Sequence, residues 1–179
     1  VTHNQELSEF TFANIDTYIS VNQMREMILE SNPAYPTIST ETGFPIRTNQ
    51  DDSCNAFYDY SSINFYTTGS GCNNTGFPSV TWHEYGHHAI ACAGSGQNEY
   101  GEGHSDAFAM VMTPTFDPQL GRGFFANSCD SGIRNADNTC QFQTSGCSSC
   151  GSAIHSCGQL HSGCIYDLWQ AVSQSSPFI

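Results

Sequence analysis

Lysine is absent from this 179-residue chain, and four arginines are its only strongly basic side chains. Seventeen acidic residues bring the formal net charge to −13. A chain with this balance offers no basic patch that could bind a nucleic-acid backbone, so we expect no nucleic-acid partner. The excess of carboxylates predicts a soluble protein that attracts cationic rather than anionic substrates at low salt.

Long apolar runs are also missing. No stretch approaches the roughly 20 apolar residues that span a bilayer, so we expect no membrane span. Val1 begins no signal-peptide pattern. We therefore expect any secretion signal or pro-segment, including an inhibitory propeptide, to have been removed already. The length predicts one domain that covers residues 1–179.

Cysteine, in contrast, is abundant. Nine cysteines in a chain rich in serine, glycine and asparagine indicate an oxidising compartment, and hence a secreted, disulfide-bonded protein. An odd number leaves at least one thiol free or paired outside the chain. The favoured pair is Cys54 with Cys72. The alternative is a structural zinc bound by Cys147, Cys150, Cys157 and Cys164, whose spacings differ from those of zinc ribbons and fingers.

The segment His83-Glu84-Tyr85-Gly86-His87 has the form H-E-x-x-H. Residues four apart lie on one face of a helix, so the two imidazoles could bind a single zinc ion. Glu84 could then reach a water in an open zinc position and accept its proton. Because so short a pattern also arises by chance on amphipathic helices, the hypothesis needs a third ligand.

Glu102 follows His87 by fifteen residues and is our candidate for that third ligand. Asp106 lies one helical turn later and could accept a hydrogen bond from the far nitrogen of a zinc-bound histidine, which would fix its tautomer. The alternative is that both acids only complement the dipole at a helix N-terminus. The order of His, Glu, His, Glu and Asp favours a zinc centre.

Helical periodicity predicts four helices, at residues 10–30, 79–92, 101–113 and 158–176. Asn14 or Asp16 would cap the first helix. Its packing face would comprise Ile15, Tyr18, Ile19, Met24, Met27 and Ile28. The third helix would pack through Ala107, Phe108, Met110 and Val111. The fourth would pack through Leu160, Cys164, Leu168, Trp169 and Val172.

Strand signals are confined to the first half of the chain. Residues 54–58 and 63–66 are aromatic-rich runs joined by a turn, which predicts a β-hairpin, and residues 44–47 form a further short strand. We thus expect an α+β fold in which a small mixed sheet with an edge hairpin lies over the H-E-x-x-H helix. About residues 1–96 would hold this sheet and helix. About residues 97–179 would hold the second ligand helix, disulfide-rich loops and a C-terminal helix.

Further segments carry a family likeness. Asn55-Ala56-Phe57-Tyr58 resembles the N-A-F-W edge strand beside bound peptide, and Gly101-Glu102-Gly103-His104-Ser105-Asp106 is similar to G-E-G-W-S-D of fungalysins. Gly132-Ile133-Arg134 resembles a segment whose arginine contacts a substrate carbonyl. His155-Ser156-Cys157-Gly158 is a weaker match to H-x-x-G before the last active-site helix. With the H-E-x-x-H motif, residues 54–172 resemble the gluzincin metallopeptidases, which include the thermolysin and fungalysin families.

The resemblance implies a zincin-like fold and a secreted zinc endopeptidase that hydrolyses peptide bonds. Glu84 would act as general base and then as proton donor to the leaving amine. Asn55 and Ala56 would bind the peptide main chain, as in strand addition. Arg134 and His155 would lie near the reacting carbonyl. His161 is the alternative to His155. The neighbouring His88 and His104 are interpreted as packing residues.

The chain departs from the family pattern in several places. The link from His87 to Glu102 is shorter than in either named family, and the thermolysin-type tyrosine in that link has no clear counterpart. Cys150 stands where the family has an aspartate that positions the catalytic histidine. Calcium is a candidate cofactor, but the acids that bind it are not recognisable. Most of the C-terminal helical subdomain also lacks a counterpart, which predicts a compact, cysteine-braced version of the fold.

Two other functions fit the same residues. A zinc aminopeptidase or other small-peptide hydrolase would need an acidic group that captures a free amine. A non-catalytic binding module would retain the zinc only for structure. Glu84 speaks against the second alternative, because a structural site usually fills all four zinc positions with protein ligands and has no use for that carboxylate.

Overall fold

The computed structural model describes residues 8–175, so Val1 and Pro177 lie outside it. The described helices are α1 (Glu9–Ser31), α2 (Pro78–Cys92), α3 (Asn98–Val111) and α4 (Ile154–Ser175). The described strands are β1 (Ile46–Gln50), β2 (Ala56–Tyr58), β3 (Ile63–Tyr66), β4 (Gln119–Leu120), β5 (Arg134–Asn135), β6 (Phe142–Gln143) and β7 (Gly146–Ser148). The fold is therefore mixed α+β, as predicted. Within residues 8–175, no helix is long and apolar enough to cross a membrane.

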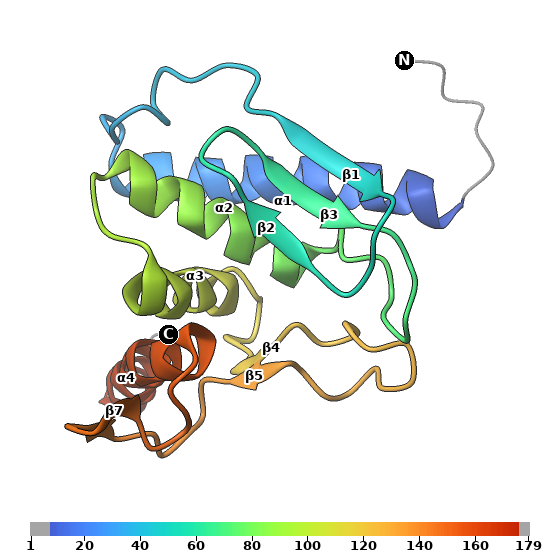
Figure 1. Ribbon diagram of the computed structural model, residues 1–179. Helices are drawn as coiled ribbons and strands as arrows, with labels where there is room; N and C mark the ends of the chain where they lie inside the picture. The colour runs from blue at the N-terminus through green and yellow to red at the C-terminus, as the bar shows by residue number, and fades with distance from the viewer. Residues whose placement is uncertain (1–7, 176–179) are drawn as a thin grey trace.

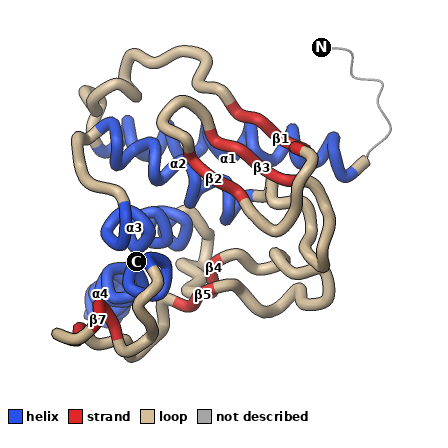
Figure 2. Tube along the Cα trace, in the orientation of Figure 1, coloured by secondary structure: helices blue, strands red, loops and turns tan. Residues whose placement is uncertain are grey.

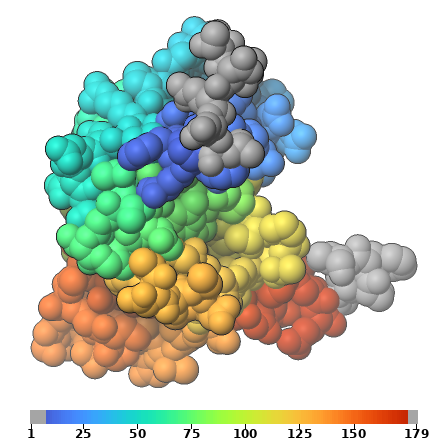
Figure 3. Space-filling model, turned by 90° about the vertical axis from the view of Figure 1, so that its right-hand side faces the viewer, coloured from blue at the N-terminus to red at the C-terminus, as the bar shows by residue number. Residues whose placement is uncertain are grey.

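The elements are stacked in layers. Figure 1 shows the main sheet lying over α2, with α3 below α2 and α4 below α3. In Figure 2, loops and turns make up most of the chain between α3 and α4. Figure 3 shows the molecule from the side, where the blue-to-green surface of the first half lies above the orange-to-red surface of the second half. The stacking brings α2, α3 and the start of α4 close together.

The main sheet has the strand order β1-β3-β2. β1 runs parallel to β3, whereas β2 is antiparallel to β3 with Phe57 opposite Asn64. This pairing confirms the predicted hairpin, and the predicted strand at residues 44–47 instead begins at Ile46. β2 pairs with no second strand among the described residues. One edge of β2 therefore has backbone groups free of sheet hydrogen bonds.

α1 differs from its predicted cap and packing face. Ser8 is the cap, and its side chain accepts a hydrogen bond from the amide of Thr11. Of the predicted packing residues, Met24 and Ile28 are buried, whereas Ile15, Tyr18 and Ile19 are exposed. The buried face includes small and polar side chains instead, namely Ala13, Thr17 and Ser20. These let α1 approach α2 closely enough for the Trp82 indole to donate to the Ser20 carbonyl, 3.2 Å away.

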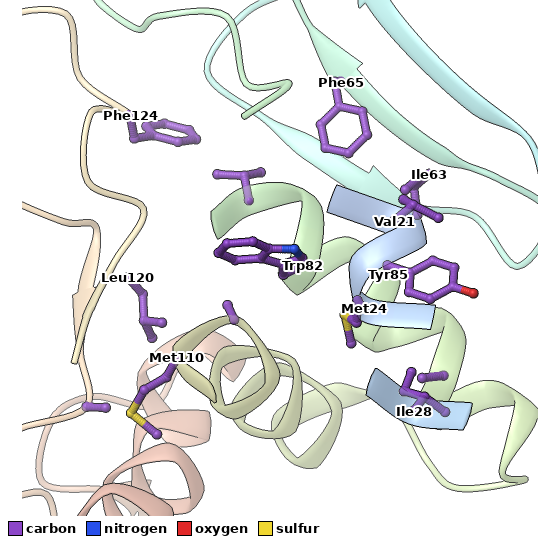
Figure 4. Close-up of a cluster of buried hydrophobic side chains, with 14 of the residues drawn as sticks. Val21, Met24, Ile28, Ile63, Phe65, Trp82, Tyr85, Met110, Leu120 and Phe124 are labelled. Atoms are coloured by element: carbon purple, nitrogen blue, oxygen red, sulfur yellow. The ribbon is translucent and has the colours of Figure 1, made fainter. Parts of the chain in front are cut away.

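One buried apolar cluster joins the layers. Figure 4 shows Trp82 and Tyr85 of α2 among side chains from α1 and the sheet, with Met110 of α3 and Leu120 of β4 on the other side. Every residue of α2 from Val80 to Ile90 is buried. A helix buried all round is held firmly in place, so the positions of its two motif histidines are well defined.

Glycines set the contact between α3 and α4. A Cβ atom at Gly158 would lie 2.7 Å from the backbone nitrogen of Gly103, so the helices meet backbone to backbone at this point. The predicted packing faces are partly wrong: Val111, Cys164, Leu168 and Val172 are exposed. Large apolar side chains are excluded from the closest part of a contact that only glycine allows.

Three disulfides connect the described cysteines, Cys54–Cys72, Cys140–Cys150 and Cys147–Cys157. The first confirms the predicted pair around the hairpin. The alternative zinc site is not formed, because Cys147 and Cys150 belong to different disulfides. Three thiols remain free in the described chain, those of Cys92, Cys129 and Cys164. This pattern is compatible with an extracellular protein.

The disulfide pattern can be checked directly by counting thiols. In the denatured, non-reduced protein, alkylation should label Cys92, Cys129 and Cys164, and the other six cysteines should react only after reduction. Peptide mapping by mass spectrometry measures both sets. Labelling of eight or nine thiols before reduction would contradict the disulfides, and labelling of Cys147, Cys150, Cys157 and Cys164 together would restore the cysteine–zinc alternative.

Candidate active site

Two helices supply three potential metal ligands. α2 carries His83 and His87 one turn apart, and α3 carries Glu102. A Cβ atom at Gly86 would lie 3.0 Å from the Cα atom of Ser105, so this unspecified position of the motif lets α3 pack directly on α2. All three ligand side chains are buried. The contact at Gly86 thus places Glu102 beside the two imidazoles.

The ligand atoms converge on one point. The Nε2 atoms of His83 and His87 are 3.2 Å apart. Oxygens of Glu102 lie 3.3 Å from Nε2 of His83 and 3.7 Å from Nε2 of His87. A tetrahedral ion with metal–ligand bonds of about 2.0–2.1 Å would hold such atoms roughly 3.3 Å apart. This is the one group of metal-ligating side chains among the described residues that could hold a metal ion.

The environment of Glu102 also suits a cation. Its buried Oε2 atom makes no hydrogen bond with any described residue. It lies within ion-pair distance of two ring nitrogens, 3.3 Å from Nε2 of His83 and 3.3 Å from Nε2 of His155. A buried carboxylate oxygen without a hydrogen bond is costly, and a metal ion would satisfy it.

Asp106 orients the first histidine, as its spacing predicted. Its Oδ1 atom lies 2.8 Å from Nδ1 of His83. A carboxylate accepts hydrogen bonds, so Nδ1 carries the proton and Nε2 faces His87 and Glu102. Asp106 is fixed in turn by Arg134, whose Nε and Nη2 atoms donate hydrogen bonds to its carboxylate over 2.7 and 2.6 Å. Burial raises the pKa of Asp106, but Arg134 and His83 outweigh this and hold it below its ordinary value.

Gln97 orients the second histidine, His87, although no motif in the sequence pointed to this residue. Its Nε2 atom donates to the carbonyl of His87 over 3.0 Å, and its Oε1 atom lies 2.7 Å from Nδ1 of the same residue. A backbone carbonyl only accepts hydrogen bonds. The side-chain amide of Gln97 must therefore direct its NH2 group toward the carbonyl of His87 and its oxygen toward the imidazole ring. Nδ1 of His87 therefore carries a proton, and Nε2 is left for a metal. Gly101 makes room, since a Cβ there would lie 2.8 Å from Oε1 of Gln97.

Arg134 is engaged within the protein. Its side chain is 12% exposed, and both hydrogen bonds to Asp106 come from its guanidinium group. The Nη2 atom of Arg134 also lies 3.5 Å from Nδ1 of His83. Burial lowers its pKa, but Asp106 reverses the shift and keeps the guanidinium charged. The predicted contact with a substrate carbonyl is untested, and the contact made within the chain is with Asp106.

Burial and charge set the protonation of the centre. Burial raises the pKa of Glu84 to about 7. Burial and the nearby His83 lower that of His87 to about 4. Burial also lowers the pKa of His83, but the carboxylates of Asp106 and Glu102 outweigh it and raise the value to about 10. Without metal, His83 is thus protonated, and binding of a metal ion would release that proton.

Two cavities meet at this centre. The smaller, of about 80 Å³, extends toward β4 and β5, with walls that include Val80, Ala109, Leu120, Phe124, Ile133 and Arg134. The larger, of about 330 Å³, extends along β2 and has walls that include Phe57, Tyr58, Tyr60, Gln97, Asn98 and Ile154. Both are lined by Asn55, Ala56, His83, Glu84 and His155. The predicted edge-strand residues therefore lie beside Glu84.

The structure separates the two candidates in the last helix. α4 begins at Ile154, so His155 lies in its first turn rather than before it. Its side chain is about half exposed and lines both cavities. His161 lines neither of these two, and its Nε2 atom lies 2.9 Å from Nδ1 of His104. Of the two, His155 is the one near Glu84.

His88 occupies the opposite side of α2. Its buried ring lies between Glu41, 2.9 Å from Nε2, and the hydroxyl of Tyr58, 3.3 Å from Nδ1. Phe44 stacks on it with ring centroids 4.0 Å apart. The contacts agree with the predicted packing role of His88 and fix the ring of Tyr58.

The role of Gln97 yields a direct test. Replacing Gln97 with leucine removes the acceptor for Nδ1 of His87, and we expect metal affinity to fall about 10- to 100-fold. Competition with a chromophoric chelator measures the affinity. Gln23→Leu, on the exposed face of α1, is the matched control and should leave it unchanged. Equal affinity in the wild type and Gln97→Leu would show that the amide does not position the ligand.

Comparison with known proteins adds no relative: no protein-family model matches this chain, and no curated protein matches it at a significant level.

Proposed function

We propose that this protein is a secreted, zinc-dependent endopeptidase with a zincin-like fold of the gluzincin type. The single observation that carries the proposal is the convergence of His83, His87 and Glu102 in one buried group, with Glu84 beside it. The order of these residues along the chain supports a gluzincin. The three disulfides support secretion.

Zinc fits the ligand set best. Two imidazoles and one carboxylate are typical of catalytic zinc sites, which use three protein ligands and leave a position open. Bound there, zinc supplies a Lewis acid that polarises a carbonyl and lowers the pKa of water. His83, His87 and Glu102 would hold the ion, and Asp106 and Gln97 keep both Nε2 atoms directed at it.

Glu84 is the proton carrier of the proposal. Its carboxylate is buried and lies where the two cavities meet. A pKa near neutrality lets one group first accept a proton from the attacking water and then donate it to the leaving amine. Burial has the further effect of keeping bulk water from competing for this proton.

The edge strand gives the substrate a place to bind. An extended peptide could add to the free edge of β2, where Asn55 and Ala56 line both cavities. The bond to be cleaved would then lie beside Glu84. His155 would donate to the oxyanion from the α4 side, while Arg134 keeps the ligand network rigid through Asp106.

The two rival functions are less well supported. An aminopeptidase needs a carboxylate to bind a free amine. Among the described residues that line the two cavities, the acids are Glu84, Glu102 and Asp106, and each already has a role at the centre. A structural zinc site would need a fourth protein ligand, and none joins the three within residues 8–175.

Glu84→Gln separates catalysis from metal binding. The amide has the same shape but cannot accept a proton, so turnover should fall on the order of 10²- to 10⁴-fold, while zinc content stays at one per chain. Cleavage of an unstructured protein and metal analysis give the two readouts. The wild type should lose activity with a chelator and regain it with zinc. Near wild-type turnover of Glu84→Gln, or full zinc content in His87→Ala, would contradict the proposal.

His155 and His161 provide a matched pair. Removing a donor to the oxyanion should cost on the order of 10²-fold in kcat, so His155→Ala should be slow with KM and zinc content little changed. His161→Ala should retain most of its turnover, because that ring bonds to His104 instead. Steady-state kinetics of both variants decides the assignment. The reverse result would move the role to His161.

A further inference from the structure

The turn between β2 and β3 holds a bulky side chain where the backbone favours glycine. The amide of Asp59 donates to the carbonyl of Ser62 over 3.1 Å, so Tyr60 and Ser61 are the two central residues of a tight hairpin turn. Tyr60 has a φ of +67°. Turns with a positive φ at the first central residue normally have glycine there, and a tyrosine is an outlier.

The turn does not need this tyrosine for its shape. One carboxylate oxygen of Asp59 accepts hydrogen bonds from the amides of Ser61 and Ser62, over 2.9 and 2.7 Å. The other accepts from the Ser62 hydroxyl over 3.0 Å. None of these bonds involves Tyr60, and glycine would adopt the same conformation without strain. Backbone strain that local structure does not require is typical of functional positions.

The ring of Tyr60 lies at the larger cavity of the proposed active site. The residue is 71% exposed, and it lines that cavity together with Tyr58. The two ring centroids are 5.3 Å apart at an angle of 49°. Tyr58 is held by its contact with His88, and the exposed Tyr60 packs beside it, so the two rings form one aromatic side of the cavity. Figure 1 shows this turn at the end of the edge strand.

The charge of the whole chain favours a cation. The described lining of the cavity contains no arginine, and its two carboxylates, Glu84 and Glu102, belong to the centre that would hold the zinc ion. The guanidinium of Arg47, on β1, lies 3.8 Å from the carboxylate of Asp59 in this turn and is not part of the lining. The chain as a whole has a formal net charge of −13. Aromatic faces attract cations, and this field adds to the attraction.

We propose that Tyr58 and Tyr60 form a subsite for a cationic side chain, arginine or lysine, of the bound peptide. The proposal rests on the proposed peptidase function and deepens it by naming the class of substrate. Tyr60 determines the specificity, because the turn does not require its side chain for the fold. The recognised residue lies on the side of the cleaved bond away from Arg134, which lines only the smaller cavity.

The test compares peptides that differ only in charge. In a set of decapeptides with one cleavable bond, each position carries either arginine or its uncharged isostere citrulline. Wild-type kcat/KM should favour arginine about two- to fivefold at one position. Tyr60→Gly should abolish that preference without lowering Tm, and Tyr60→Phe should retain it. Tyr18→Leu, a change at an exposed tyrosine on α1, is the matched control and should leave the preference unchanged.

A second measurement does not depend on hydrolysis. Dissociation constants of the same peptides for zinc-loaded Glu84→Gln, with and without Tyr60→Gly, report the subsite alone. If the wild type cleaves none of the peptides, the endopeptidase proposal fails, and these constants still decide the subsite. An arginine preference that survives Tyr60→Gly in both measurements would overturn the subsite, as would a Tm lowered by Tyr60→Gly.

Discussion

The close approach of three helices is the constraint on which the candidate site depends. Gly86 lets α3 rest on α2, and Gly103 and Gly158 let α4 rest on α3. The first contact brings Glu102 to the two histidines, and the second brings His155 to Glu102. A methyl group at any of these glycines would force the helices apart and separate groups that must lie a few ångströms from one another.

This arrangement concentrates buried charge in a small volume. His83, Glu84, Glu102, Asp106 and Arg134 all lie in or next to the centre, where each charge is costly unless it is paired. Arg134 bonds to Asp106, and Asp106 bonds to His83, so most of these charged groups have a partner. Oε2 of Glu102 makes no hydrogen bond with a described residue, and it lies 3.3 Å from Nε2 of His83, where a metal ion would bind. The burial of these charged side chains is thus better explained by the geometry of a metal-binding centre than by any gain in the stability of the fold.

Local spacing explains what could be predicted. The i, i+4 geometry of a helix is fixed, so the sequence alone predicted that His83 and His87 share a face and that Asp106 follows Glu102 by one turn. Two aromatic-rich runs joined by a turn predicted the hairpin, and its flanking cysteines predicted Cys54–Cys72. The predicted packing face of α1 was wrong because large apolar residues were taken as the packing side, whereas small residues allow the closer contact with α2.

By itself, then, the sequence determined the α+β composition, the candidate metal-binding group His83, His87 and Glu102, and the acidic, disulfide-bonded character of the chain. Only the tertiary structure decided that Gln97 orients His87, that Arg134 bonds to Asp106, and that His155 rather than His161 lies near Glu84. Each of these contacts joins segments that no common helix or strand connects. Their distances follow from how α2, α3 and α4 pack, and a sequence pattern records only the spacing within one element.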